Sequence, residues 1–307
     1  MPVCERDPWR LQFFENVPCP DDVLIPTDDP DCWSWYPTHR WVYDKLKIAA
    51  SQGLACGPHG VSPPHFPVFS KPMMNMKGMG IGSRVIDTAA DFEHYYEPGH
   101  MWMELLQGEH VSTDCAVRDG RMMWNRHATG EAWDNGMFKY WTIHAAAKTA
   151  LESYLANWIM QHMAGYTGMM NFETIDGRVI ETHLRFADQW CDLYGGGWVE
   201  ALVKLYQTGR WEFGDSQRRD GFSVPLFARH GAAFRHPAPQ HQAAIRAMPH
   251  VTSLQITFHE TKDAADHPMP PGGFRLGIVN CTNYAAGLAA RRELANAFPP
   301  DRIILPD

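Results

Sequence analysis

The stretch that decides the fold is GMMNFETIDGRVIETHLR, which runs from Gly168 to Arg185. Two strand-like runs flank the Asp176-Gly177 pair, and an Asp-Gly pair between such runs is a strong signal for a tight hairpin turn. Residues i, i+2 and i+4 of a strand share one face. The second strand is therefore predicted to point Glu181, His183 and Arg185 in the same direction.

Glu173 lies on the first strand of this hairpin, close enough across the turn to join Glu181. Two carboxylates on one sheet face repel each other unless something bridges them. A divalent cation does so, and oxygen ligands suit Mg²⁺, which keeps its waters and is shared with substrate phosphates. Arg185 would then clamp an anionic substrate or a developing negative charge. The alternative is an exposed hairpin whose alternate polar residues are simply solvated.

Composition narrows the class of protein. The chain has 307 residues, 45% of them hydrophobic, which excludes disordered and fibrous classes. A net charge of −8 argues against nucleic acid as the main partner, and no apolar run reaches the roughly 18 residues of a membrane span. The seven cysteines are irregularly spaced and odd in number, and the N-terminus lacks a signal-peptide core. We therefore expect a reduced, cytoplasmic protein.

A lysine before a glycine-rich turn is the second feature of interest. The run FPVFSKP (Phe66–Pro72) is β-rich, the glycine-rich turn MMNMKGMGIG (Met73–Gly82) follows, and SRVI returns as a strand. This pattern predicts a hairpin that carries Lys71 at the end of its incoming strand. An ammonium group beside mobile backbone N–H groups is what cradling a nucleoside triphosphate requires.

The other predicted elements are helices and strands spread along the chain. Residues 207–250 are polar and His-rich and show no clear pattern. Periodicity and turn residues predict helices over 41–52, 144–163, 198–206 and 285–298, strands over 100–106, 253–259 and 274–281, and a hairpin over 110–124 with its turn at Asp119-Gly120.

From about Trp41 to Arg185, the order of lysine, glycine-rich turn, interrupted apolar strand, long helix and paired glutamates resembles the ATP-grasp superfamily, in particular its biotin-carboxylase-like and GAR-synthetase-like cores. The resemblance implies an α+β fold in which two α+β subdomains grip a nucleotide, with a small C-terminal strand–helix extension. It implies an irregular arm over 1–40, a core over 41–205 with a hinge near 101–107, and an extension over 206–307.

The same resemblance implies the residues of the site. MKGMGIG resembles the flexible loop over the phosphates, and MELLQGEHVSTD resembles the hinge strand that holds adenine and ribose. The implied nucleotide-binding residues are Lys45, Lys71, Gly78, Gly80, Gly82, Glu104, Leu106 and His110, the implied metal ligands are Glu173, Glu181 and His183, and the implied catalytic residues are Arg185 and Lys71.

Three departures from the family pattern bear on function. His183 stands where the family usually has Asn, and imidazole suits Mn²⁺ or Zn²⁺ better than Mg²⁺. FADQW, after Arg185, lacks the Glu-His pair of the carboxylases, which argues against bicarbonate as a substrate. About 40 residues precede the first lysine, too few for the full N-terminal domain of many relatives, so part of the acceptor site is expected to be missing.

The resemblance implies an ATP-dependent ligase that activates a carboxylate through an acyl phosphate for attack by an amine or similar nucleophile. ATP and Mg²⁺, or Mn²⁺, are the implied cofactors. A small-molecule substrate is the expected partner, and neither nucleic acid nor a membrane is expected. A second copy of the chain or a partner subunit is expected to supply part of the acceptor site. Two alternatives stay open: an ATP-dependent small-molecule kinase and a catalytically weak nucleotide-binding subunit.

Overall fold

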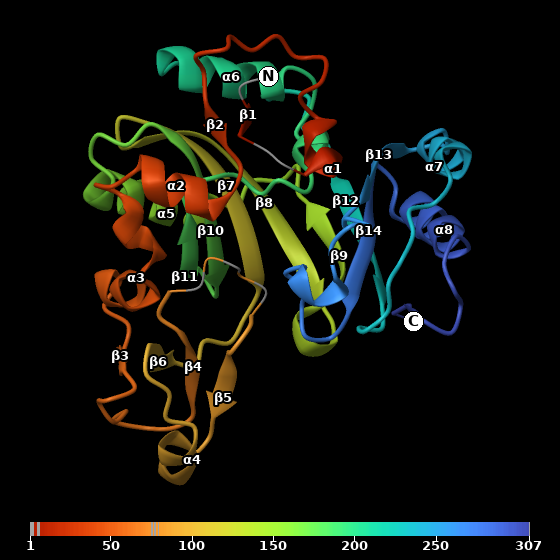
Figure 1. Ribbon diagram of the computed structural model, residues 1–307. Coiled ribbons are helices and arrows are strands. Elements are labelled where there is room, and N and C mark those ends of the chain that lie inside the picture. The colour runs from red at the N-terminus through yellow and green to blue at the C-terminus, as the bar shows by residue number, and fades with distance from the viewer. Residues whose placement is uncertain (1–2, 5–6, 75, 77, 79, 307) are drawn as a thin grey trace. The chain divides into compact units, whose positions relative to one another are not determined.

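The computed structural model describes residues 3–4, 7–74, 76, 78 and 80–306 (Figure 1). The chain forms two compact units. Unit 1 comprises residues 1–25, 126–148 and 187–307, and unit 2 comprises residues 26–125 and 149–186. No helix in the described ranges is long and apolar enough to cross a membrane. The expected division into an arm over 1–40, a core over 41–205 and an extension over 206–307 stays a prediction.

A small antiparallel sheet forms one part of unit 2. Its order is β3-β6-β4-β5, with β3 (Cys56–Pro58), β4 (Val68–Pro72), β5 (Arg84–Ile86) and β6 (His100–Glu104). Helix α4 (Ala89–His94), capped by Thr88, buries Phe92 against this sheet. The predicted hairpin around the glycine-rich turn is confirmed as β4 and β5. Asn75, Lys77 and Met79 of that turn lie outside the described residues.

The second sheet of unit 2 contains the decisive hairpin. β7 (His110–Arg118), β10 (Gly168–Ile175) and β11 (Arg178–His183) pair in the order β11-β10-β7. Strand β8 (Arg121–Ala132) carries the chain from unit 2 into unit 1. Both predicted Asp-Gly turns are confirmed, since Asp119 and Asp176 each have φ 49° and the glycines after them have φ 69° and 71°. Positive φ at both central residues is the geometry of a type I′ turn.

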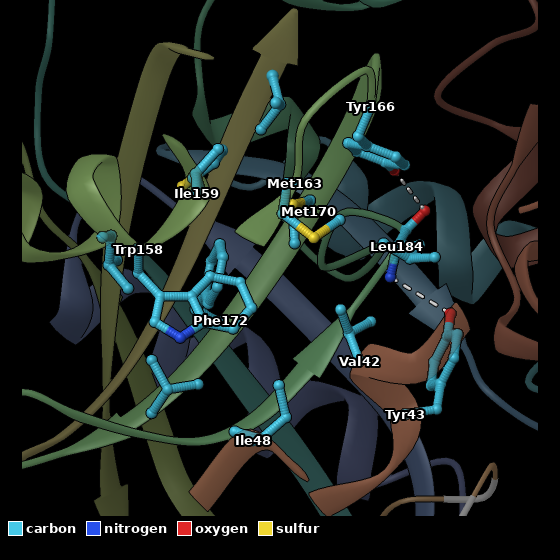
Figure 2. Close-up of a cluster of buried hydrophobic side chains, with 14 of the residues drawn as sticks. Val42, Tyr43, Ile48, Trp158, Ile159, Met163, Tyr166, Met170, Phe172 and Leu184 are labelled. Carbon is cyan, nitrogen blue, oxygen red and sulfur yellow. Dashed lines mark hydrogen bonds between the residues drawn. The ribbon is translucent and has the colours of Figure 1, made fainter. Parts of the chain in front are cut away.

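Helices cover this sheet and close its core. They are α2 (Asp29–Trp35), the 3₁₀ helix η1 (Arg40–Tyr43), α3 (Lys45–Ser51) and α5 (Thr149–His162). Helix α5 buries Leu155, Trp158 and Ile159, positions that helical spacing places on one face. Figure 2 shows Trp158 beside Phe172 of β10, and their ring centroids lie 5.5 Å apart, edge to face.

Unit 1 is built on strands in the order β8-β9-β12-β14-β13, in which β9 is Phe138–Ile143, β12 is Gly221–Ala228, β14 is Phe274–Cys281 and β13 is Val251–Ile256. Helices α7 (Pro239–Arg246) and α8 (Tyr284–Ala295) pack on β12, β13 and β14 around a core that includes Leu226, Leu276 and Leu294. The remaining elements are β1 (Val3–Cys4), α1 (Pro8–Leu11), β2 (Ile25–Pro26), η2 (Asp134–Gly136), η3 (Cys191–Leu193), α6 (Trp198–Thr208), η4 (Ala264–Asp266) and β15 (Ile303–Ile304).

Three expectations are corrected by this arrangement. The helix predicted from residue 144 begins at Thr149, because His144 instead donates its backbone N–H to the carbonyl of His127 at 2.9 Å. The unassigned segment 207–250 contains β12 and α7. Strand β12 was not predicted because it is buried at nearly every position, which removes the alternation of a half-buried strand. The arm over 1–40, expected to be irregular, contains the short helices α1 and α2.

The core packing of α5 predicts a difference between two positions of that helix. Leu155→Ala is expected to lower the free energy of unfolding by about 2–5 kcal/mol, because it leaves a cavity among fully buried neighbours. Met160→Ala, at a residue 60% exposed on the same helix, should change it by no more than about 0.5 kcal/mol. Urea unfolding of both variants measures the difference, and equal effects would contradict this packing.

Candidate active site

Two buried lysines in unit 2 reach the same strand. Lys45 begins α3, and its backbone N–H donates to the carbonyl of Met73 at 2.9 Å, which ties the helix start to the end of β4. The Lys45 Nζ lies 2.9 Å from Glu181 Oε1, and the Lys71 Nζ donates to the backbone oxygen of Ile180 at 2.8 Å. Only 6% and 5% of these two lysines is exposed. Both predicted ATP-contacting lysines therefore meet on β11.

The positive charges of the two ammonium groups are not equally balanced by carboxylates, because Lys45 contacts Glu181 whereas Lys71 contacts a backbone oxygen. Burial and the nearby charge of Lys45 lower the pKa of Lys71 to about 8, although Glu181 and Glu173 oppose the shift. The neutral backbone oxygen of Ile180 is its hydrogen-bond acceptor. Lys71 is consequently a buried cation next to which an anion would be strongly stabilised.

The paired glutamates lie directly opposite each other, as predicted. Glu173 and Glu181 are partners in the β10–β11 register, and the ladder shifts immediately after Glu173. Glu173 Oε2 lies 3.3 Å from His110 Nε2. Burial raises the pKa of Glu173, but the hydrogen bond and charge of His110 outweigh it and hold that pKa at about 2. Burial lowers the pKa of His110, and Glu173 reverses this effect and raises it.

The donor atoms fit a divalent cation in kind, although they do not yet surround one. In the described part of the chain, no three His, Cys, Asp or Glu side chains converge closely enough to hold an ion. Glu181 faces Lys45, Glu173 faces His110, and His183 Nε2 lies 3.8 Å from Glu181 Oε1. Two carboxylates and one imidazole are ligand types that a divalent metal accepts.

A buried carboxylate that sequence reasoning missed completes the cluster. Asp29, in the first turn of α2, receives the Arg185 guanidinium in two contacts of 3.0 Å, one to each oxygen. His183 Nδ1 lies 3.1 Å from both oxygens, and the Tyr43 hydroxyl donates to Oδ1 at 3.1 Å. Burial opposes ionisation, yet Arg185 and His183 hold the pKa of Asp29 well below its usual range. The Asp29-Pro30 pair is a signal for a helix start, but nothing in it points to a strand 154 residues away.

The remaining predicted nucleotide residues lie on β6 and around the turn. Glu104 is tied to Ala55 by its backbone N–H and by its carboxylate, which accepts from Ala55 N at 3.1 Å. Leu106 packs on the apolar cluster of Ala49, Met101 and Met103, which Ile180 also contacts. This cluster is buried and lies beside Lys71, which is opposite Met101 in the pairing of β4 with β6.

The predicted glycines of the turn have a backbone that favours glycine. Gly78, Gly80 and Gly82 have φ of 63°, 65° and 77°. A side chain at Gly82 would in addition come within 3.2 Å of His100 Nε2. Side-chain contacts and the β10–β11 pairing join seven predicted residues into one cluster, namely Lys45, Lys71, His110, Glu173, Glu181, His183 and Arg185. Glu104, Leu106 and the three glycines lie on neighbouring elements.

No family model matches the chain, and no curated protein is similar to it in sequence. Solved structures are similar in fold. An L-amino acid ligase from Bacillus licheniformis is 13% identical with a TM-score of 0.59, over 97% of this chain and 84% of that one. Phosphoribosylamine–glycine ligase from Thermotoga maritima is 13% identical with a TM-score of 0.62, over 92% and 85%.

A third similar structure was solved with a nucleotide. Carboxyaminoimidazole ribonucleotide synthase from Aspergillus clavatus, complexed with ATP, is 11% identical with a TM-score of 0.57, over 87% of this chain and 75% of that one. These neighbours are ATP-grasp enzymes. The similarity extends over most of each chain, and this protein therefore has the ATP-grasp fold that its lysines, glycine-rich turn and facing glutamates predict.

Proposed function

We propose that this chain is an ATP-dependent ligase that activates a carboxylate as an acyl phosphate for attack by an amine. The observation that carries the proposal is the meeting of two buried lysines with two facing glutamates on β10 and β11. Buried ammonium groups beside paired carboxylates are suited to hold the phosphates of a nucleotide and its divalent cation. The similar fold of an amino acid ligase and a glycine ligase supports the reaction class.

The chain's residues would act by position and charge. Lys45 and Lys71 bind the phosphates of ATP, a carboxylate oxygen attacks the γ-phosphorus, and the bond to the β-phosphate oxygen breaks to release ADP. Arg185, fixed by Asp29, steadies the transferred phosphoryl group. The amine nitrogen then attacks the acyl carbon, inorganic phosphate leaves, and the nitrogen gives up a proton to solvent.

Glu173, Glu181 and His183 are the residues that would hold a divalent cation, Mg²⁺ or Mn²⁺. Such an ion supplies neutralisation of the phosphate charge. We also propose a small-molecule carboxylate and amine as partners, a second copy or partner subunit completing the acceptor site, and the cytoplasm as compartment. Six described cysteines are free, which supports a reducing compartment.

Product analysis tests the reaction class. The protein is incubated with Mg-ATP and a panel of carboxylates, with and without amines, and ADP release is measured. Release that requires both a carboxylate and an amine supports the ligase. Release that never depends on an amine would establish a kinase instead, and ATP binding without turnover on any substrate would leave a nucleotide-binding subunit.

The pKa of Lys71 predicts how ATP affinity depends on pH. Phosphate binding needs the ammonium form, so the affinity should fall as the pH rises above about 8, by at most about tenfold per pH unit. Binding at pH 8.5 should take up a proton, because the phosphates raise the pKa of Lys71. Titration calorimetry in buffers of different ionisation enthalpy measures this uptake.

Lys71→Ala provides the decisive comparison for that pH effect. It should weaken ATP binding strongly and abolish the proton uptake. Lys47→Ala is the matched control, since Lys47 lies two residues after Lys45 on α3 with its side chain 64% exposed. If Lys71→Ala binds ATP as the unaltered protein does, the assignment of Lys71 to the phosphates is wrong.

Glu181→Gln separates the metal role of Glu181 from its salt bridge. Mg-ATP should stabilise the unaltered protein by about 2.7 kcal/mol at a hundredfold excess over Kd, and the variant should lose the metal-dependent part. Without nucleotide, the variant should be less stable by about 1–3 kcal/mol, because Lys45 loses its partner at 2.9 Å. Glu293→Gln, at a side chain 48% exposed on α8, is the control. Thermal and urea unfolding with and without Mg-ATP would show an unchanged metal effect if Glu181 is not a ligand.

A further inference from the structure

Asp29 is a buried carboxylate to which the proposed reaction gives no direct contact with substrate. Only 5% of Asp29 is exposed, and its carboxylate oxygens lie 3.0–3.1 Å from donor atoms of Arg185, His183 and Tyr43. A buried carboxylate is costly unless charged or polar donors surround it. Three donors from other parts of the chain converge on Asp29, which lies on the short helix α2. This arrangement indicates that Asp29 stays ionised and that each donor is held in one orientation.

The contact with His183 determines which ring nitrogen carries the proton. A carboxylate only accepts hydrogen bonds, so the nitrogen that faces Asp29, Nδ1, must carry a hydrogen. In the neutral ring the lone pair then lies on Nε2, the nitrogen that is 3.8 Å from Glu181 Oε1. Histidines that bind metals commonly donate their other N–H to a carboxylate in this way, which fixes both tautomer and ring orientation.

Arg185 is held by the same carboxylate and cannot replace it as a partner of the ring. Its Nε and Nη2 contact the two oxygens of Asp29, and Nη1 donates to the carbonyl of Phe186 at 3.2 Å. Arg185 Nη2 lies 3.5 Å from His183 Nδ1, and both groups are donors. Asp29 is thus the acceptor that allows an arginine and a histidine to lie side by side.

We propose that Asp29 is a positioning residue that presents His183 Nε2 as a nitrogen ligand beside Glu181, so that the site prefers Mn²⁺ to Mg²⁺. Mg²⁺ favours oxygen ligands, and an imidazole nitrogen shifts the preference toward later divalent metals. This inference rests on the proposed function, because the cation site belongs to that proposal.

Calorimetric titration with Mn-ADP and with Mg-ADP tests the metal preference without any turnover. The unaltered protein is expected to bind Mn-ADP more tightly than Mg-ADP. Asp29→Asn should weaken Mn-ADP binding by about 10–100-fold and reduce that preference. Asp31→Asn, an equal charge change in the same first turn of α2, should leave both affinities unchanged.

His183→Asn supplies the second arm of the test. In that background Asp29→Asn should no longer alter the Mn²⁺ preference, because no imidazole remains to be oriented. A preference that survives Asp29→Asn, or that is absent from the unaltered protein, would overturn the inference. Failure of the unaltered protein to bind either complex would overturn the proposed function as well, whereas amine-dependent turnover with no Mn²⁺ preference would overturn the inference alone.

The ring tautomer can be measured on the unaltered chain, so the test does not depend on how well Asp29→Asn folds. Nitrogen-15 NMR of the neutral His183 ring is expected to show the proton on Nδ1 and the lone pair on Nε2. A proton on Nε2 would overturn the inference. A loss of stability in Asp29→Asn with an unchanged tautomer and unchanged metal preference would likewise overturn it and leave Asp29 as an anchor of α2.

Discussion

The salt bridge between Lys45 and Glu181 is the interaction on which the site depends. It joins the first residue of α3 to β11, and Lys71 joins β4 to the same strand through the backbone oxygen of Ile180. Because Glu181 lies opposite Glu173, both lysines are brought to the carboxylate pair. The start of α3 and the end of β4, which are far from β11 in the sequence, are thereby held at that strand, and the charges of Lys45 and Glu181 largely cancel.

This cancellation explains how so many ionisable groups can lie together in buried and partly buried positions. Glu173 faces His110, Glu181 faces Lys45, and Asp29 faces His183 and Arg185. Each pair offsets part of the cost of desolvating its members. Lys71 is the exception, because its hydrogen bond goes to a neutral oxygen and burial lowers its pKa to about 8. An additional anion beside Lys71 would therefore stabilise the cluster, which is what the proposed phosphate-binding role of Lys71 requires.

The predictions that succeeded rest on local patterns. Asp-Gly turns have a characteristic backbone, so both hairpins and the facing of Glu173 and Glu181 could be derived from residues close in the sequence. The order of motifs identified the fold even though no single motif is specific. Strand β12 was missed because uniform burial removes alternation, and Asp29 was missed because its partners lie on a strand that no local pattern links to α2. In the structure Glu181 contacts Lys45 and Glu173 contacts His110, pairings that only the tertiary arrangement shows, and the bridging cation stays a prediction.

Asp29, which the sequence did not reveal as a site residue, changes how the histidine at position 183 is understood, where the family usually has Asn. An amide at that position offers an oxygen ligand directly, whereas an imidazole has two different nitrogens and must be fixed before it offers a lone pair. Asp29 supplies that fixation through Nδ1 and holds Arg185 with the same two oxygens. His183 and Asp29 therefore form one unit in which neither residue is informative alone. His183 departs from the family pattern in the sequence. The orientation and tautomer of its ring depend on Asp29, which lies on α2 in the segment that was expected to be irregular.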